Sequence, residues 1–167
     1  MEYLLIDAYN VINSWNDIFD MRKDSLEDCR DKLLNILSNY QGFRNVKIYV
    51  VFDAHMVKGR RYKEETFDNL TVVFTKENQT ADNYIERFVY NLGNIHTIRV
   101  VTADYLEQTM ILRSGGARMT PKELREEIKL TTKHDKSRYA NKKSSINGLF
   151  SNVDSSTLEE LEKLRRS

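Results

Sequence analysis

Hydrophobic and polar positions along this chain of 167 residues follow two alternating patterns. Short apolar runs, rich in β-branched and aromatic residues, predict four strands. These runs are Tyr3–Ile6, Val46–Phe52, Leu70–Phe74 and Thr97–Thr102. Between and after them, apolar residues recur at helical spacing, which predicts amphipathic helices. Near-continuous apolar strands that alternate with such helices indicate an α/β protein whose parallel sheet is covered on both faces.

The predicted helices have recognisable starts and ends. A Ser or Thr stands before three of them, where its hydroxyl can accept a hydrogen bond from a backbone N–H of the first turn. These three caps are Ser25, Thr80 and Thr120, and a fourth helix over residues 105–113 is closed by two glycines. We expect the helix after Thr120 to end at about Thr132.

The C-terminal part of the chain has a different composition. From Lys133 to Ser155 the apolar periodicity is lost, and Lys, Ser and Asn predominate, which predicts a basic loop. A last short helix is expected where Ser156 and Glu159 form a capping-box pattern. We therefore expect a main domain over residues 1–132, and a basic loop with a short C-terminal helix over residues 133–167 as part of the same domain.

The net charge is only +1, but the basic residues are concentrated in two places. Such a separation of basic surface from acidic residues suits an enzyme that acts on an anionic polymer. The basic residues predicted to contact such a polymer are Lys58, Arg60, Arg61, Lys133, Lys136, Arg138, Lys142 and Lys143.

Cysteine usage and hydropathy indicate the compartment. Cys29 is the single cysteine, which excludes an internal disulfide and favours a reducing cytoplasm without a disulfide-linked partner. Its expected place is a buried helix face. No stretch approaches the ~20 apolar residues of a membrane span, and no signal peptide is recognisable. We expect a cytoplasmic protein.

An aspartate stands at or soon after the end of each predicted strand. Asp7 and Asp53 directly follow the first two strands, Asp82 lies in the first turn after the third, and Asp104 follows the fourth. In a parallel sheet the carboxyl ends of the strands meet at one edge, where loops and helix N-termini converge. We therefore expect these four carboxylates in one neighbourhood.

Carboxylates that are forced together repel one another and need a compensating charge. A hard divalent cation supplies it, and Mg²⁺ or Mn²⁺ at such a site can polarise a phosphodiester and activate a water. Asn10, three residues past Asp7, is placed to orient a phosphate or a water. Each aspartate also has a structural interpretation, because Asp favours turns and helix N-termini. That alternative stays open, above all for Asp82 in its helical turn and for Asp53 beside its loop.

Other residues near these strand ends also allow two interpretations. His55 can contact substrate or carry a proton, or it can simply form a hydrogen bond within its loop. Tyr9, Trp15 and Tyr105 can stack on bases, although rim packing is the commoner role of aromatic residues there.

Taken together, five segments resemble the YacP-like branch of the NYN nucleases, which are bacterial relatives of PIN-domain ribonucleases. The resemblance covers about the first 125 residues, with the motifs in order and at the expected spacing. The segments that carry it are Leu5–Asn10, Val50–His55, Val57–Gly59, Phe74–Asp82 and Val101–Gln108.

The resemblance implies a PIN-like three-layer sandwich with a central, mainly parallel sheet. It implies that Asp7, Asp82 and Asp104 coordinate Mg²⁺ or Mn²⁺ and that Asn10 joins them in catalysis, with Asp53 as a further acid. It also implies an endoribonuclease that cleaves mRNA in association with the ribosome, so that ribosomal RNA would be a partner of the basic segment.

The chain departs from the family pattern beside two of the acids. Ala8 stands where Gly is usual, which should restrict the backbone next to Asp7. Ala103 stands where a Ser commonly precedes the acid, so a hydrogen bond to a ligand could be lost unless Thr102 replaces it.

Other functions fit the residues less well. A non-catalytic RNA- or ribosome-binding module on a nuclease fold is the main alternative, although clustered acids give nothing to a pure RNA binder. A signalling receiver domain needs two adjacent acids after the first strand, and Asp7 is followed by Ala8 and Tyr9. A small-molecule phosphatase would need an Asp-x-Asp pair, which the sequence lacks.

Overall fold

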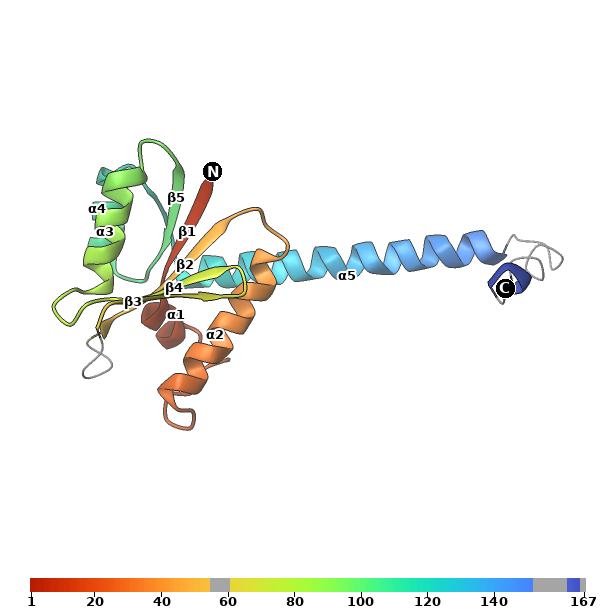
Figure 1. Ribbon diagram of the computed structural model, residues 1–167, viewed down its shortest axis with the longest axis horizontal. Helices are drawn as coiled ribbons and strands as arrows, with labels where there is room; N and C mark the ends of the chain where they lie inside the picture. Colours follow the sequence, from red (N-terminus) through yellow and green to blue (C-terminus); the bar gives the residue numbers. More distant parts are fainter. Residues whose placement is uncertain (55–60, 152–161, 166–167) are drawn as a thin grey trace. The chain divides into compact units, whose positions relative to one another are not determined.

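The computed structural model describes residues 1–54, 61–151 and 162–165, with the side chains of 146–151 outside that description. The chain forms two compact units, Met1–Ile128 and Lys129–Ser167. A six-stranded sheet runs through the first unit in the order β3-β4-β2-β1-β5-β6 (Figure 1). Its strands are β1 (Glu2–Asp7), β2 (Lys47–Phe52), β3 (Lys63–Phe67), β4 (Leu70–Phe74), β5 (Thr97–Val101) and β6 (Ala117–Met119).

The sheet is parallel except at one edge. β1 pairs in parallel with β2 and β5, β2 with β4, and β5 with β6, whereas β3 pairs with β4 as an antiparallel hairpin. The four predicted strands and the mainly parallel sheet are thus confirmed. β3 and β6 were not predicted, because β3 is a largely charged, exposed edge strand and β6 has only three residues.

The helices are α1 (Ala8–Ser14), α2 (Leu26–Gln41), α3 (Ala81–Leu92), α4 (Tyr105–Arg113) and α5 (Pro121–Ser151). All three predicted caps are confirmed. The Ser25 hydroxyl accepts a hydrogen bond from the Asp28 N–H, and the Thr80 hydroxyl accepts one from Asn83, each at 3.1 Å. Thr120 and Glu123 form a complete capping box, with reciprocal bonds of 3.1 and 3.0 Å.

Helices cover both faces of the sheet, which gives three layers. Alternate residues of β1 point to opposite faces, so Leu4 and Ile6 pack with α1, α2 and the first turns of α5. Leu5 belongs to a second core with Ile85 of α3 and Ile111 of α4. The predicted three-layer α/β fold is therefore confirmed, and Cys29 is buried in the first of these cores.

The predicted end of the last long helix was wrong. α5 continues past Thr132 to Ser151, so residues 133–151 form a helix instead of a basic loop. The segment lacks an apolar stripe, but Lys, Arg and Ala favour helix, and after Pro121 no Pro or Gly interrupts it before Gly148. The predicted cap at Ser156 lies outside the described residues. Of the helices that the structure describes, none has the length and apolar character that crossing a bilayer requires.

Two of the aromatic residues near the strand ends are part of the core. Trp15 is 3% exposed, and its indole N–H donates a hydrogen bond of 2.8 Å to the Pro121 carbonyl. Tyr9 packs edge-on against Phe52, with ring centroids 5.4 Å apart. Neither is available for stacking on bases, whereas Tyr105 is exposed.

Candidate functional site

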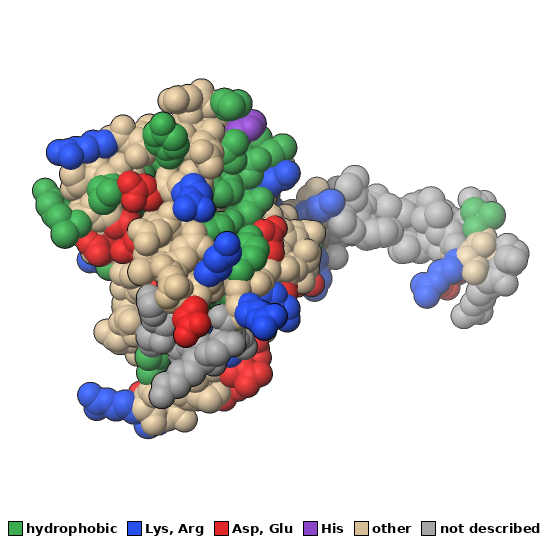
Figure 2. Space-filling model, turned by 60° about the vertical axis from the view of Figure 1, so that its left-hand side comes forward, with side chains coloured by type: hydrophobic (Ala, Val, Ile, Leu, Met, Phe, Trp, Pro, Cys, Tyr) green, Lys and Arg blue, Asp and Glu red, His purple; other side chains and the backbone are tan. Residues whose placement is uncertain are grey.

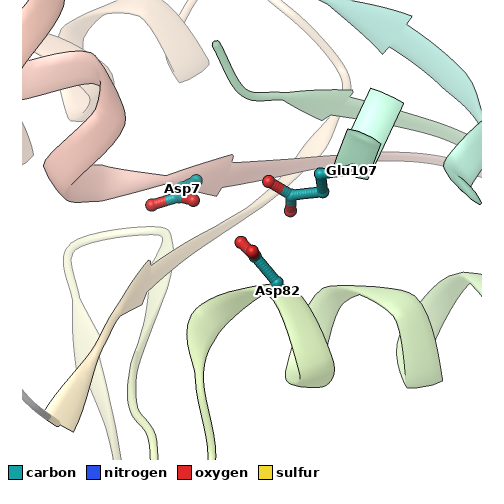
Figure 3. A group of neighbouring side chains, drawn as sticks. All are labelled: Asp7, Asp82 and Glu107. Atoms are coloured by element: carbon teal, nitrogen blue, oxygen red, sulfur yellow. The ribbon is translucent and has the colours of Figure 1, made fainter. Parts of the chain in front are cut away.

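Three carboxylates converge at the sheet edge where β1 ends. Asp7, Asp82 and Glu107 each offer an oxygen atom, and these atoms lie within 4.8 Å of one another. Figure 3 shows the three side chains pointing toward a common space from three different elements. Over residues 1–54, 61–151 and 162–165, no other group of three His, Cys, Asp or Glu side chains comes as close together. We call this group the acidic cluster.

Strand order explains the convergence. Asp7 is the last residue of β1 in the middle of the sheet, Asp82 lies in the first turn of α3 after β4, and Glu107 lies in the first turn of α4 after β5. Because β1, β4 and β5 point the same way, their carboxyl ends lie along one edge. The structure therefore brings Asp7 and Asp82 together, as the strand pattern predicts.

Burial and mutual repulsion make two of these carboxyls weak acids. Asp7 is 4% exposed. Desolvation and the Asp82 charge raise its pKa to about 7, while hydrogen bonds from Asn10 act in the opposite direction. Burial, with the charges of Asp7 and Asp82, also raises the pKa of Glu107 well above its usual range, against a hydrogen bond from Thr102. A bound cation would stabilise both groups as anions.

The surroundings of Glu107 fit a metal ligand. Its Oε2 accepts a hydrogen bond of 2.6 Å from the Thr102 hydroxyl. Its Oε1 is buried and, among the described residues, accepts no hydrogen bond from an N–H or hydroxyl group; the Asp82 carboxyl is within hydrogen-bonding reach of Glu107. A buried acceptor without a partner costs free energy unless something else satisfies it. A hard divalent cation held by oxygen ligands would do so, and the neighbouring Asp7 and Asp82 oxygens supply further ligands of the right kind.

Asn10 positions Asp7. Its side-chain N–H donates a hydrogen bond of 2.8 Å to Asp7 Oδ2, and its Oδ1 accepts one of 3.2 Å from the Ala103 backbone N–H. Asn10 thereby ties the end of β1 to the loop after β5. Thr102 acts similarly on Glu107, so a hydroxyl that holds an acid is present although residue 103 is Ala. Ala8 lies at the start of α1 without a positive φ, and its position does not require Gly.

The other two predicted acids lie outside the acidic cluster. Asp104 is exposed and caps α4, because its Oδ1 accepts hydrogen bonds from the Leu106 and Glu107 N–H groups at 2.9 and 3.4 Å. Asp53 accepts a 3.3 Å hydrogen bond from the Ala81 N–H at the start of α3. Each of these acids holds the first turn of a helix that carries a cluster residue.

Sequence reasoning missed Glu107. It follows Asp104 by three residues, which looks like an ordinary capping pattern. A signal was nevertheless present, because Glu107 stands four residues before Ile111, a core residue of the same helix. Residues at that spacing share a helix face, so the pattern puts a carboxylate on the same face of the helix as the apolar Ile111.

The predicted RNA-contacting residues are distributed over both units. Arg61 is exposed in the first unit. The five predicted cations of the second unit are also exposed, and all belong to α5; they are Lys133, Lys136, Arg138, Lys142 and Lys143. Lys58, Arg60 and His55 lie outside the described residues.

Comparisons with known proteins agree with the fold. The model of the YacP-like NYN domain matches residues 4–166. The uncharacterized protein YacP of Bacillus subtilis (strain 168) is 43% identical over 129 residues, which make up 77% of this chain and 75% of YacP. A crystal structure of Rae1 (YacP) from Bacillus subtilis aligns with a TM-score of 0.72 at 36% identity and covers 100% of this chain and 96% of that one. A mutant form aligns with a TM-score of 0.73 at 32% identity, covering 98% and 99%.

Proposed function

This chain belongs to the YacP-like NYN domain family, and from that premise we propose that it is a metal-dependent endoribonuclease. The NYN domain is a nuclease fold, which makes RNA the class of substrate. The observation that carries the proposal is the acidic cluster, in which a buried Glu107 oxygen accepts no hydrogen bond from an N–H or hydroxyl group of the described residues.

Asp7, Asp82 and Glu107 hold Mg²⁺ or Mn²⁺ in this proposal. The bound ion would supply positive charge that polarises the phosphodiester and makes a water more acidic. Asn10 fixes the Asp7 carboxylate and Thr102 fixes Glu107, so the ligand oxygens are held in place before substrate arrives. Asp104 and Asp53 hold the first turns of α4 and α3, and either acid can also face the substrate.

Hydrolysis at this site uses water as the nucleophile. The water oxygen bonds to phosphorus and loses a proton, while the bond to the 3′ oxygen breaks and that oxygen takes up a proton. The products are a 5′-phosphate and a 3′-hydroxyl end. Burial raises the pKa of both Asp7 and Glu107, so binding of a cation would displace protons from the acidic cluster.

Metal dependence tests the proposal directly. We expect the wild-type chain to cut labelled mRNA on translating ribosomes or free in solution with Mg²⁺ or Mn²⁺, and not after chelation by EDTA. Returning Mn²⁺ should restore cleavage. Mapping the ends by ligation and phosphatase treatment should find 5′-phosphates. Absence of cleavage under all metal conditions, with no heat of Mn²⁺ binding by calorimetry, would favour a non-catalytic RNA-binding module.

We further propose that the basic part of α5 docks on ribosomal RNA. Lys133, Lys136 and Lys143 are spaced by three and seven residues and therefore share one helix face. Arg138 and Lys142, four residues apart, share another. All five are exposed cations, which suits phosphate contact.

Changing Lys136, Arg138, Lys142 and Lys143 together to Gln should weaken co-sedimentation with ribosomes about tenfold or more at physiological salt, and should reduce its salt dependence. The matched control changes Arg22, Lys23, Arg113 and Lys122, four exposed cations of the first unit. Equal ribosome binding by both variants would refute the docking role and leave the nuclease proposal unaffected.

A further inference from the structure

The outer face of α3 extends away from the acidic cluster and carries residues that the proposed chemistry does not use. Asn83 directly follows Asp82, and Arg87 and Tyr90 come four and seven residues after Asn83, so the three share one helix face. Arg87 is exposed, and Tyr90 is 76% exposed. Tyr90 lies about 12 Å from Asp82 along the helix axis, a length that three or four stacked nucleotides span at about 3.4 Å each.

Two adjoining hollows lie along this face. One of about 490 Å³ is lined by Asn83, Arg87 and Tyr90. The other, of about 370 Å³, is lined by Tyr62 and Tyr84. The two share Lys76, Gln79 and Arg87, so they form one continuous surface around the start of α3. We call this surface the α3 groove. In Figure 2 the side of the chain that carries α3 and α4 comes forward, with Lys and Arg side chains scattered among hydrophobic, acidic and neutral ones.

The chemistry of the α3 groove matches single-stranded RNA. Lys76 and Arg87 form no ion pair with any residue that the structure describes, and their charge is therefore available for phosphates. Glu86 also lines the groove, next to Arg87. With two cations and one anion among its lining residues, the groove still has a net positive charge. Exposed tyrosines such as Tyr90 provide rings on which unpaired bases stack, and the Gln79 amide can bond base edges.

We propose that the α3 groove binds the single-stranded RNA segment that flanks the scissile phosphate, with phosphates on Lys76 and Arg87 and a base stacked on Tyr90. This rests on the proposed nuclease function, because the acidic cluster at the start of α3 is where the scissile bond would lie. A stable protein interface takes roughly 20–30 residues from each partner, whereas eleven residues line the two hollows.

Binding of a fluorescein-labelled single-stranded oligoribonucleotide, followed by anisotropy in EDTA, tests the groove without cleavage. The Lys76→Ala/Arg87→Ala variant should bind at least about tenfold more weakly. The slope of log K against log salt concentration should become shallower by about 1.4, the value for two lost phosphate contacts on a single strand. The control Lys23→Ala/Arg113→Ala removes the same charge from exposed positions elsewhere and should change neither quantity.

Tyr90 gives a second, uncharged readout. Tyr90→Ala should weaken binding about tenfold with an unchanged salt dependence, and Tyr90→Phe should restore it, because stacking needs only the ring. Groove variants that bind like the Lys23/Arg113 control would overturn the proposal, even if the wild type cuts RNA. An equal loss with duplex RNA of the same length would overturn the single-strand assignment. Loss of binding in a chain that never cuts RNA would support the groove and contradict the nuclease function.

Discussion

Glu107→Gln is expected to reduce RNA cleavage by at least about 100-fold, more than the loss typical of residues that only support a ligand. Gln keeps the size of Glu and can still accept the Thr102 hydrogen bond. It cannot become an anion, so it cannot serve as the carboxylate ligand that the acidic cluster supplies from α4. Single-turnover cleavage rates at saturating protein, with Mn²⁺ affinity measured by calorimetry, would report both effects.

The fold should tolerate this change. In the metal-free protein near neutral pH, Glu107 holds a proton because burial raises its pKa, and a neutral Gln therefore matches the state that it replaces. Melting temperature should be equal to or above that of the wild type. Glu27→Gln, an exposed substitution in the first turn of α2, is the matched control and should cleave at the wild-type rate. Wild-type cleavage by the Glu107 variant would exclude Glu107 from the metal site.

Stability of the metal-free protein should fall as pH rises from about 4 to about 8. Asp7 has a pKa of about 7 in the folded chain, whereas the ordinary value for an aspartate is 3.8. Between these values the folded state keeps a proton that the unfolded state has lost, so raising the pH favours unfolding. One pKa unit corresponds to about 1.4 kcal/mol, and the full shift corresponds to several kcal/mol, on the order of 10 °C in melting temperature. Glu107 adds to the loss in the same direction.

Divalent metal should reverse this loss, because it binds the ionised carboxylates and only in the folded state. We expect Mg²⁺ or Mn²⁺ to raise the melting temperature strongly at about pH 8 and little at about pH 5. Asp7→Asn should make the melting temperature in EDTA less dependent on pH, and should remove most of the rise in melting temperature that Mg²⁺ or Mn²⁺ causes. A wild-type melting temperature that is independent of metal at the higher pH would contradict the proposed site, whereas Asp24→Asn, an exposed change, should behave like the wild type.

Local signals in the sequence were sufficient for most of the fold. Four strands were recognisable because buried parallel strands are continuous apolar runs, and the caps at Ser25, Thr80 and Thr120 depend only on neighbouring backbone N–H groups. β3 could not be recognised, because its charged residues form a strand only by pairing with β4. The length of α5 was misjudged for a different reason. The prediction relied on an apolar stripe, whereas intrinsic helix propensity favours the helix.

The sequence by itself determined that acids gather at one edge of the sheet, since Asp7 ends β1 and Asp82 begins α3. Only the tertiary structure decided which acid completes the group. Asp104 and Glu107 are three residues apart, and the spacing of Glu107 to Ile111 tells only that these two share a helix face, not which way that face points. Packing of Ile111 in the core turns the face of α4 that also carries Glu107 toward Asp7, while Asp104 stays exposed at the cap. The rotation of a helix on a sheet depends on its buried contacts, and these exist only in the folded chain.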